Sequence, residues 1–128
     1  MSTLATYRVT ADWFSDAEVT LQVNLDVLTP ALAAEINQFW SSAEDRLQDE
    51  DGDVVRTVVR MFGAAAIRHF MDDGGASFGP HSEGDRYWTE QVLKAQAEGW
   101  PGLDGLGILI LGAEVSAVGY HDVTLEAL

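Results

Sequence analysis

The chain has 128 residues, of which 47% are hydrophobic, and its 21 acidic and 7 basic residues give a formal net charge of −14. This length and hydrophobic content predict a single globular domain over residues 1–128. The chain has no cysteine, which excludes disulfides, zinc–thiolate sites and cysteine nucleophiles. No apolar run is long enough to span a membrane, and the first residues lack the pattern of a signal peptide. We therefore expect a cytoplasmic protein.

The charge is distributed unevenly. Arg8 is the only basic residue before Arg46, none follows Lys94, and four of the seven lie between residues 46 and 68. Such a chain repels nucleic acid and anionic membranes and is attracted to basic surfaces. An alternative explanation stays open: the acidic composition only keeps the protein soluble, or reflects adaptation to salt.

The first two segments alternate between apolar and polar residues. TYRVTADW places Tyr7, Val9, Ala11 and Trp13 on one face, and EVTLQVNLD places Val19, Leu21, Val23 and Leu25 on one face. Period two with a short FSDA connection predicts a β-hairpin with one solvated face.

Three helices are predicted next. The first begins with Thr29 as N-cap and Pro30 at the first helical position, and its apolar stripe continues to Leu47. The second follows Asp53 as N-cap and covers VVRTVVRMFGAAAIRHFM, where Arg56 and Arg60 form a basic stripe. After a glycine-rich loop, DDGGASFGPHSEGD, the third covers SEGDRYWTEQVLKAQAEG and closes at Gly99.

The turn GWPGLDGLG then leads into ILIL, which is apolar on both faces and predicts a buried central strand. The tail AEVSAVGYHDVTLEAL is expected to add one more strand. The fold class is therefore α+β: an antiparallel sheet, formed by the N-terminal hairpin and the C-terminal strands, packed on three helices in two layers.

The stretch RLQDEDGDVV, residues 46–55, invites comparison with an EF-hand calcium loop. With Gly52 at position 6, Leu47 takes position 1 and Val58 takes position 12, so the first and last ligands are missing. A helix–helix junction explains Gly52 and Asp53 instead, but it does not require Asp49, Glu50 and Asp51.

A second pattern matches a serine hydrolase. GASFG, residues 75–79, fits G-x-S-x-G, and Asp104 and His121 follow in the order of a triad. However, Ser77 follows a helix within a predicted loop, whereas a nucleophile elbow joins a strand to a helix. The three histidines, His69, His81 and His121, lack the spacing of a helical metal site. We expect no catalytic residues, no metal and no cofactor. The alternative is a small metabolic or hydrolytic enzyme that uses the loop over residues 74–85.

Three segments, YRVTADWF, LTPALAAEINQFW and EGWPGLDGLGILIL, together resemble a family of small acidic bacterial proteins of unknown function that is often carried on mobile elements. The resemblance covers nearly the whole chain and supplies no catalytic residues. It implies phage or plasmid cargo, where small acidic proteins often inhibit host defence as anti-CRISPR or anti-restriction proteins.

These observations lead to a functional hypothesis. The chain is expected to be a non-enzymatic inhibitor whose acidic surface mimics nucleic-acid phosphates and blocks a basic nucleic-acid-binding groove of a host defence complex. It would bind a basic nucleic-acid-handling protein and neither nucleic acid nor membrane; a homodimer is possible, and an oligomerisation or interaction module is a further alternative. The expected partner-binding residues lie within ten positions: Glu44, Asp45, Asp49, Glu50, Asp51 and Asp53.

Overall fold

The computed structural model describes residues 3–11, 17–96, 98–116 and 123–128, and its fold begins with the predicted hairpin. Strands β1 (Leu4–Thr10) and β2 (Glu18–Asn24) pair antiparallel, with Tyr7 opposite Leu21. Val19, Leu21 and Val23 are completely buried, as the alternation predicts. Trp13 lies outside the described residues.

The described residues form five helices and four strands, so the predicted α+β composition is confirmed and the predicted number of three helices is wrong. The helices are α1 (Pro30–Phe39), α2 (Ala43–Asp49), α3 (Val54–Asp72), α4 (Arg86–Gln96) and α5 (Leu103–Leu106). The remaining strands are β3 (Gly75–Phe78) and β4 (Ile108–Ser116).

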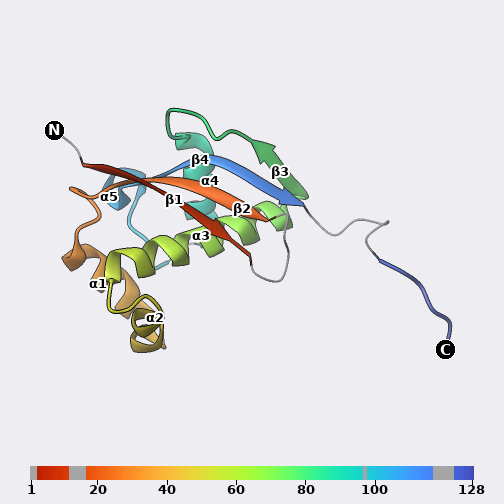
Figure 1. Cartoon of the computed structure of the whole chain (residues 1–128), viewed down its shortest axis with the longest axis horizontal. Helices are drawn as coiled ribbons and strands as arrows, with labels where there is room; N and C mark the ends of the chain where they lie inside the picture. The colour runs from red at the N-terminus through yellow and green to blue at the C-terminus, as the bar shows by residue number, and fades with distance from the viewer. Residues whose placement is uncertain (1–2, 12–16, 97, 117–122) are drawn as a thin grey trace.

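The sheet is antiparallel throughout and has the order β1-β2-β4-β3, so β4 lies between two neighbours (Figure 1). This confirms ILIL as part of a central strand. Ile110 and Leu111, which are adjacent in the strand, are both buried, as expected for a strand covered on both faces. The tail differs from its prediction: Glu114 to Ser116 continue β4, residues 117–122 lie outside the described part of the chain, and residues 123–128 form no strand.

Strand β3 lies within the segment predicted to be a loop. Gly74 and Gly75 adopt φ of +95° and +103°, which turns the chain back after α3 so that Gly75 to Phe78 pair with one edge of β4. A four-residue strand whose partner lies about 40 positions away has no local sequence signal.

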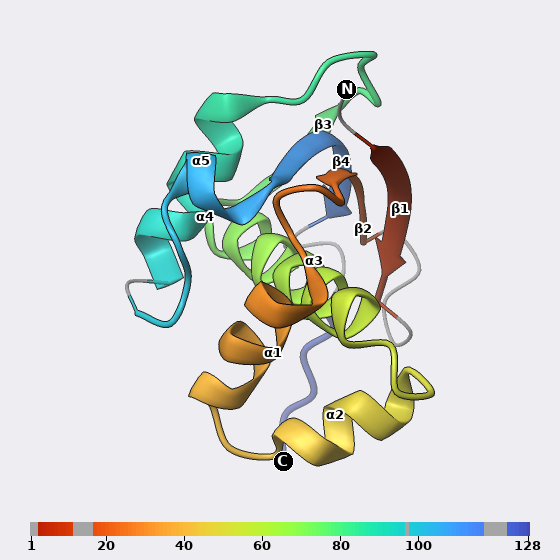
Figure 2. The same ribbon diagram turned by 90° about the vertical axis from the view of Figure 1, so that its left-hand side faces the viewer.

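Helix α3 is the centre of the hydrophobic core and runs beneath the sheet (Figures 1 and 2). Phe62 and Phe70 are its largest buried side chains. Gly63 permits close approach to β1, since a Cβ atom there would lie 2.4 Å from a methyl carbon of Val9. Helix α4 is fixed to β4 by the buried Thr89 hydroxyl, which accepts a hydrogen bond of 2.9 Å from the backbone N–H of Ile110. No helix in the described part of the chain has the length and apolar character needed to cross a membrane.

Candidate functional site

The predicted partner-binding residues lie on α2 and on the turn that joins it to α3. In Figure 2, α2 lies at the end of the molecule opposite the sheet. The sequence predicts one continuous helix up to Leu47, but α1 ends at Phe39 and α2 begins after Ser42, whose φ is +66°. The apolar stripe keeps helical spacing across this break, which is why periodicity alone does not reveal it.

Arg46 stabilises the break between the two helices. Its Nε donates to the side-chain oxygen of the buried Asn37 at 2.9 Å, and its two Nη atoms donate to the backbone oxygens of Asn37 and Ser41 at 2.9 and 2.6 Å. The side chain of Asn37 in turn donates to the backbone oxygen of Ala43 at 3.0 Å. The single cation of α2 therefore points toward the end of α1, where it compensates carbonyl groups that have no partner within the helix.

The junction between α2 and α3 is built as the sequence predicts, with one addition. Asp51 and Gly52 both have positive φ, +55° and +83°, and reverse the chain direction. The side chain of Asp53 accepts a hydrogen bond of 3.0 Å from the backbone N–H of Arg56, which confirms it as the N-cap of α3.

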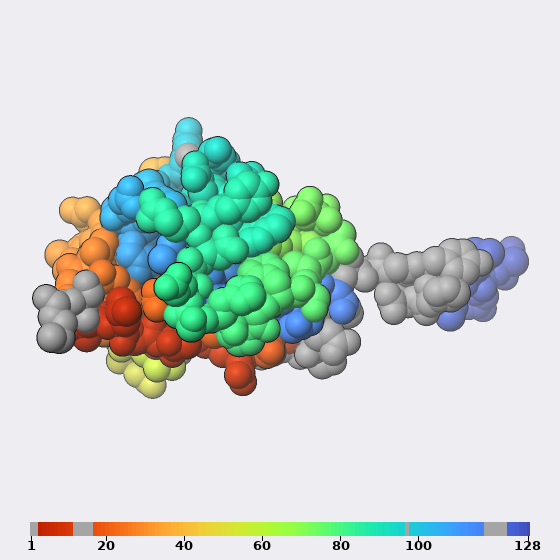
Figure 3. Space-filling view, turned by 90° about the horizontal axis from the view of Figure 1, so that it is seen from above, coloured from red at the N-terminus to blue at the C-terminus, as the bar shows by residue number. Residues whose placement is uncertain are grey.

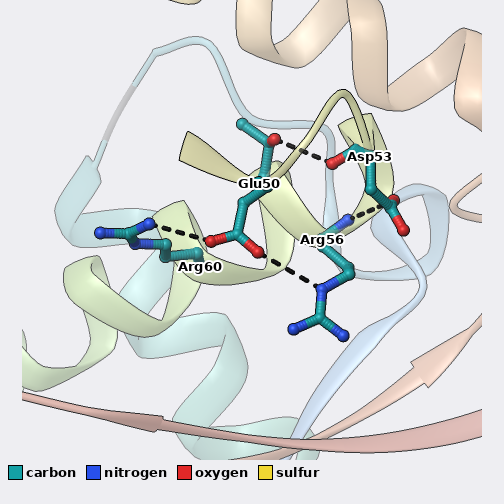
Figure 4. A network of polar contacts seen from close by, with 5 residues as sticks. Glu50, Asp53, Arg56 and Arg60 are labelled. Carbon is teal, nitrogen blue, oxygen red and sulfur yellow. Dashed lines mark hydrogen bonds and ion pairs between the residues drawn. The ribbon is translucent and has the colours of Figure 1, made fainter. Parts of the chain in front are cut away.

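The addition is Glu50, whose carboxylate lies between two arginines of α3 (Figure 4). Its oxygens lie 3.3 Å from Nε of Arg56 and 2.9 Å from Nη1 of Arg60. The Glu50 side chain is only 18% exposed, whereas both arginine side chains are 57% exposed. The expectation that the junction does not require Glu50 is therefore wrong: it attaches the turn after α2 to α3.

The six predicted residues thus divide into two groups. Glu50 and Asp53 have partners inside the molecule. The other four lie at the surface and make no ion pair with any described residue, and we call them the acidic knob: Glu44, Asp45, Asp49 and Asp51.

Among the described residues, Ser77 of the G-x-S-x-G segment hydrogen-bonds to no histidine. Ser77 lies within β3, and its hydroxyl donates to the carboxylate of Glu114 on the neighbouring strand, at 2.9 Å. Asp104 forms an ion pair of 2.9 Å with Arg86, His81 is exposed, and His121 lies outside the described residues. Among the residues that the structure describes, no three histidine or acidic side chains are grouped so that they could hold a metal ion.

A second surface, which the sequence prediction missed, lies along the exposed side of α3. Three adjoining hollows of about 530, 380 and 190 Å³ share Ala64, and together they are lined by Arg46, Arg60 and Arg68. We call this surface the α3 groove. A sequence signal is present, since residues 60, 64 and 68 are four apart, which places Arg60, Ala64 and Arg68 on one side of a helix.

Comparison with known proteins identifies relatives that align with nearly the whole chain. The chain is 30% identical over 129 aligned positions to "Protein ea10" of Escherichia phage lambda, and the alignment covers 99% of both chains. The same identity and coverage are found for "Lambda prophage-derived protein ea10" of Escherichia coli O6:H1 (strain CFT073). No solved structure matches the chain.

These relatives agree with the mobile-element context that the resemblance implied, and they say nothing of an anti-CRISPR role. Residues 18–125 match a family described as "Protein of unknown function (DUF2528)", which confirms the predicted kind of family. The chain belongs to this family of proteins of unknown function, DUF2528.

Proposed function

We propose that the chain is a non-enzymatic inhibitor that binds a basic nucleic-acid-handling protein of the host, such as a defence complex, and occupies its nucleic-acid groove. The observation that carries this proposal is the acidic knob, four carboxylates at the surface of α2 and the following turn. The relatives in phage lambda and in a lambda prophage support a role directed at host machinery.

The spacing of the knob suits phosphate mimicry. The α2 part of the knob, residues 44 to 49, spans about 7.5 Å along the helix axis, at about 1.5 Å per residue. Its three charges over that length give about one per 3 Å, close to the value of about 3.4 Å for one strand of DNA. Asp51 follows on the turn. Carboxylates can replace phosphates as acceptors for arginine and lysine side chains. The knob therefore has the charge density of a short stretch of single strand.

Helix stability does not explain all of the knob. Glu44 and Asp45 lie in the first turn of α2, where negative charge is favourable. Asp49, in contrast, lies at the C-terminal end of α2, where negative charge is unfavourable, and it is four residues from the like-charged Asp45. A helix of only seven residues would gain stability from a neutral residue there. The folding of α2 therefore does not account for Asp49, which lines the smallest hollow of the α3 groove together with Arg46 and Arg60 but forms no ion pair with a described residue. A basic partner would account for it.

The enzyme alternative receives no support from the segment over residues 74–85, because the Ser77 hydroxyl is held by Glu114 rather than by a base in a cleft. The interaction-module alternative concerns the α3 groove, whose smallest hollow is also lined by Asp49 of the knob, and is taken up in the next subsection.

The proposal is tested by immobilising the full chain, capturing proteins from host lysate, and eluting them with a short single-stranded oligonucleotide. A captured basic protein that the oligonucleotide releases supports mimicry, because both ligands then compete for one groove. Capture that resists both the oligonucleotide and about 0.5 M salt contradicts it, since ion-pair binding is strongly screened at that concentration. Direct binding of the oligonucleotide to the chain itself would also contradict it.

A further inference from the structure

Arg68 lies exposed on α3, and no described residue forms an ion pair with it. Among the arginines and the lysine that the structure describes, it is the one with neither an ion pair nor a side-chain hydrogen bond to another described residue. The sequence contains three carboxylates for each basic residue, 21 against 7. Since none of the carboxylates that the structure describes pairs with Arg68, this arginine is available to an anionic partner from another chain.

The surface around Arg68 is unusual for this protein. Arg68 lines the two larger hollows of the α3 groove, and none of the described residues that line these two is acidic. The apolar part of their lining includes two tryptophans and two methionines: Trp40, Met61, Met71 and Trp100. Tryptophan, methionine and arginine are enriched at the centres of protein–protein interfaces, whereas aspartate and glutamate are depleted.

The chain itself carries a segment that is complementary to this groove. In residues 123–128, VTLEAL, the relative exposures of Val123, Leu125 and Leu128 are 57%, 98% and 117%. Glu126 lies between the two leucines in sequence. Figures 1 and 3 show this segment apart from the body of the molecule. Three exposed apolar side chains within six residues form an apolar segment of the kind that a protein interface can bury.

We propose that the α3 groove of one copy of the chain binds residues 123–128 of a second copy, and that the exchange is reciprocal. Leu125 and Leu128 cover the methionine and tryptophan side chains of the groove, and the carboxylate of Glu126 pairs with Arg68. Because each copy offers one groove and one segment, the two contacts are equivalent and close a twofold dimer.

Both the charge and the position of the segment favour a second copy. The segment brings one carboxylate to a surface where positive side chains line the hollows, so it is attracted locally although each chain has a net charge of −14. At about 0.15 M salt the Debye length is about 8 Å, which screens the repulsion between the remaining charges. The segment also lies apart from its own body rather than against it. This proposal does not rest on the proposed function.

The test uses sedimentation velocity of the full chain over a range of concentrations, at about 0.15 M salt. Wild type should show a concentration-dependent dimer. Arg68→Glu and Glu126→Arg should each weaken dimerisation at least about tenfold, because like charges then face each other. Arg86→Glu changes the net charge as Arg68→Glu does, but lies outside the groove, and should leave the dimer intact. Leu125→Ser with Leu128→Ser should abolish the dimer without any change in charge.

A mixture of the Arg68→Glu and Glu126→Arg variants shows whether the segment in the groove comes from a second copy. In a mixed pair, the native Glu126 of the Arg68→Glu chain meets the native Arg68 of the Glu126→Arg chain in one groove. In the other groove the two introduced side chains, a glutamate at position 68 and an arginine at position 126, meet and also carry opposite charges. An exchange between copies therefore predicts that the mixture dimerises while each variant alone does not.

Three results would overturn the proposal. The first is a wild type that stays monomeric at all concentrations, and the second is a mixture of the two variants that stays monomeric. The third is a monomer in which Leu125 contacts Met61 of its own chain by nuclear Overhauser effects, because the groove would then belong to the segment of the same molecule.

Discussion

The carboxylate of Glu50 lies 2.9 Å from Nη1 of Arg60, ten residues later in the chain, and 3.3 Å from Nε of Arg56. One side chain thus holds the turn after α2 against the first two turns of α3. Glu50→Gln should lower the free energy of unfolding by about 0.5–1 kcal/mol, a modest value because both arginines are more than half exposed. Urea denaturation followed by circular dichroism measures it.

Asp49→Asn is the matched control for that change, since Asp49 is the preceding residue and pairs with no described cation. It removes an unfavourable charge from the end of α2, so stability should stay level or rise by a few tenths of a kcal/mol. A loss for Asp49→Asn equal to that for Glu50→Gln would show that the ion pairs of Glu50 are not the cause.

Asp53→Ala should cost about 1 kcal/mol, because it removes the acceptor for the backbone N–H of Arg56 at the start of α3. Asp53→Asn should restore most of this loss, since asparagine caps a helix about as well as aspartate. Equal losses for alanine and asparagine would point to the charge of Asp53 rather than to its cap.

Arg46→Gln should destabilise the protein by about 2 kcal/mol, since it leaves the buried Asn37 and the last carbonyls of α1 without their charged donor. Arg46→Lys should not recover the loss, because a single ammonium group cannot reach the backbone and side-chain oxygens of Asn37 together with Ser41. The melting temperatures of the three proteins, compared with Arg86→Gln as an exposed control, decide this point.

Chelator treatment should leave the melting curve unchanged, and micromolar calcium should not shift it. The reason is that the carboxylates of the 46–55 stretch are divided between arginine pairing, helix capping and solvent. A reproducible stabilisation that saturates near one equivalent of calcium would contradict this.

Local rules predict the parts of the fold that depend on neighbouring residues. The caps at Thr29 and Asp53 are predictable because each capping side chain and the backbone N–H that donates to it lie three positions apart. The hairpin is predictable because the alternation of apolar and polar residues is visible within each strand and does not depend on distant parts of the chain. The break after α1 is not predictable in this way, because it depends on Arg46 binding Asn37, nine residues earlier. Strand β3 is not predictable either, because it depends on pairing with β4.

The candidate site shows the same division. Charge counting locates the cluster of carboxylates, but it cannot separate Glu50, which pairs with arginines ten residues or fewer away, from Asp49 and Asp51, which pair with none of the described cations. The α3 groove is missed because it combines residues from β1, the break between α1 and α2, α2, α3 and the segment around Trp100, which only the folded chain brings together.

The proposed function requires that the acidic knob, and not net charge alone, binds the basic partner. The most direct test compares two variants for affinity to the captured nucleic-acid-handling protein at several salt concentrations. Asp49→Lys with Asp51→Lys alters the knob, and Asp72→Lys with Asp73→Lys alters exposed residues at the far end of α3.

Each pair of substitutions raises the net charge by four, from −14 to −10, so the two variants differ only in where the charge changes. The knob variant should lose more than about tenfold in affinity, mostly through slower association, and should depend less on salt, while the control stays near wild type. Full affinity in the knob variant, or equal losses in both variants, would contradict the proposed function.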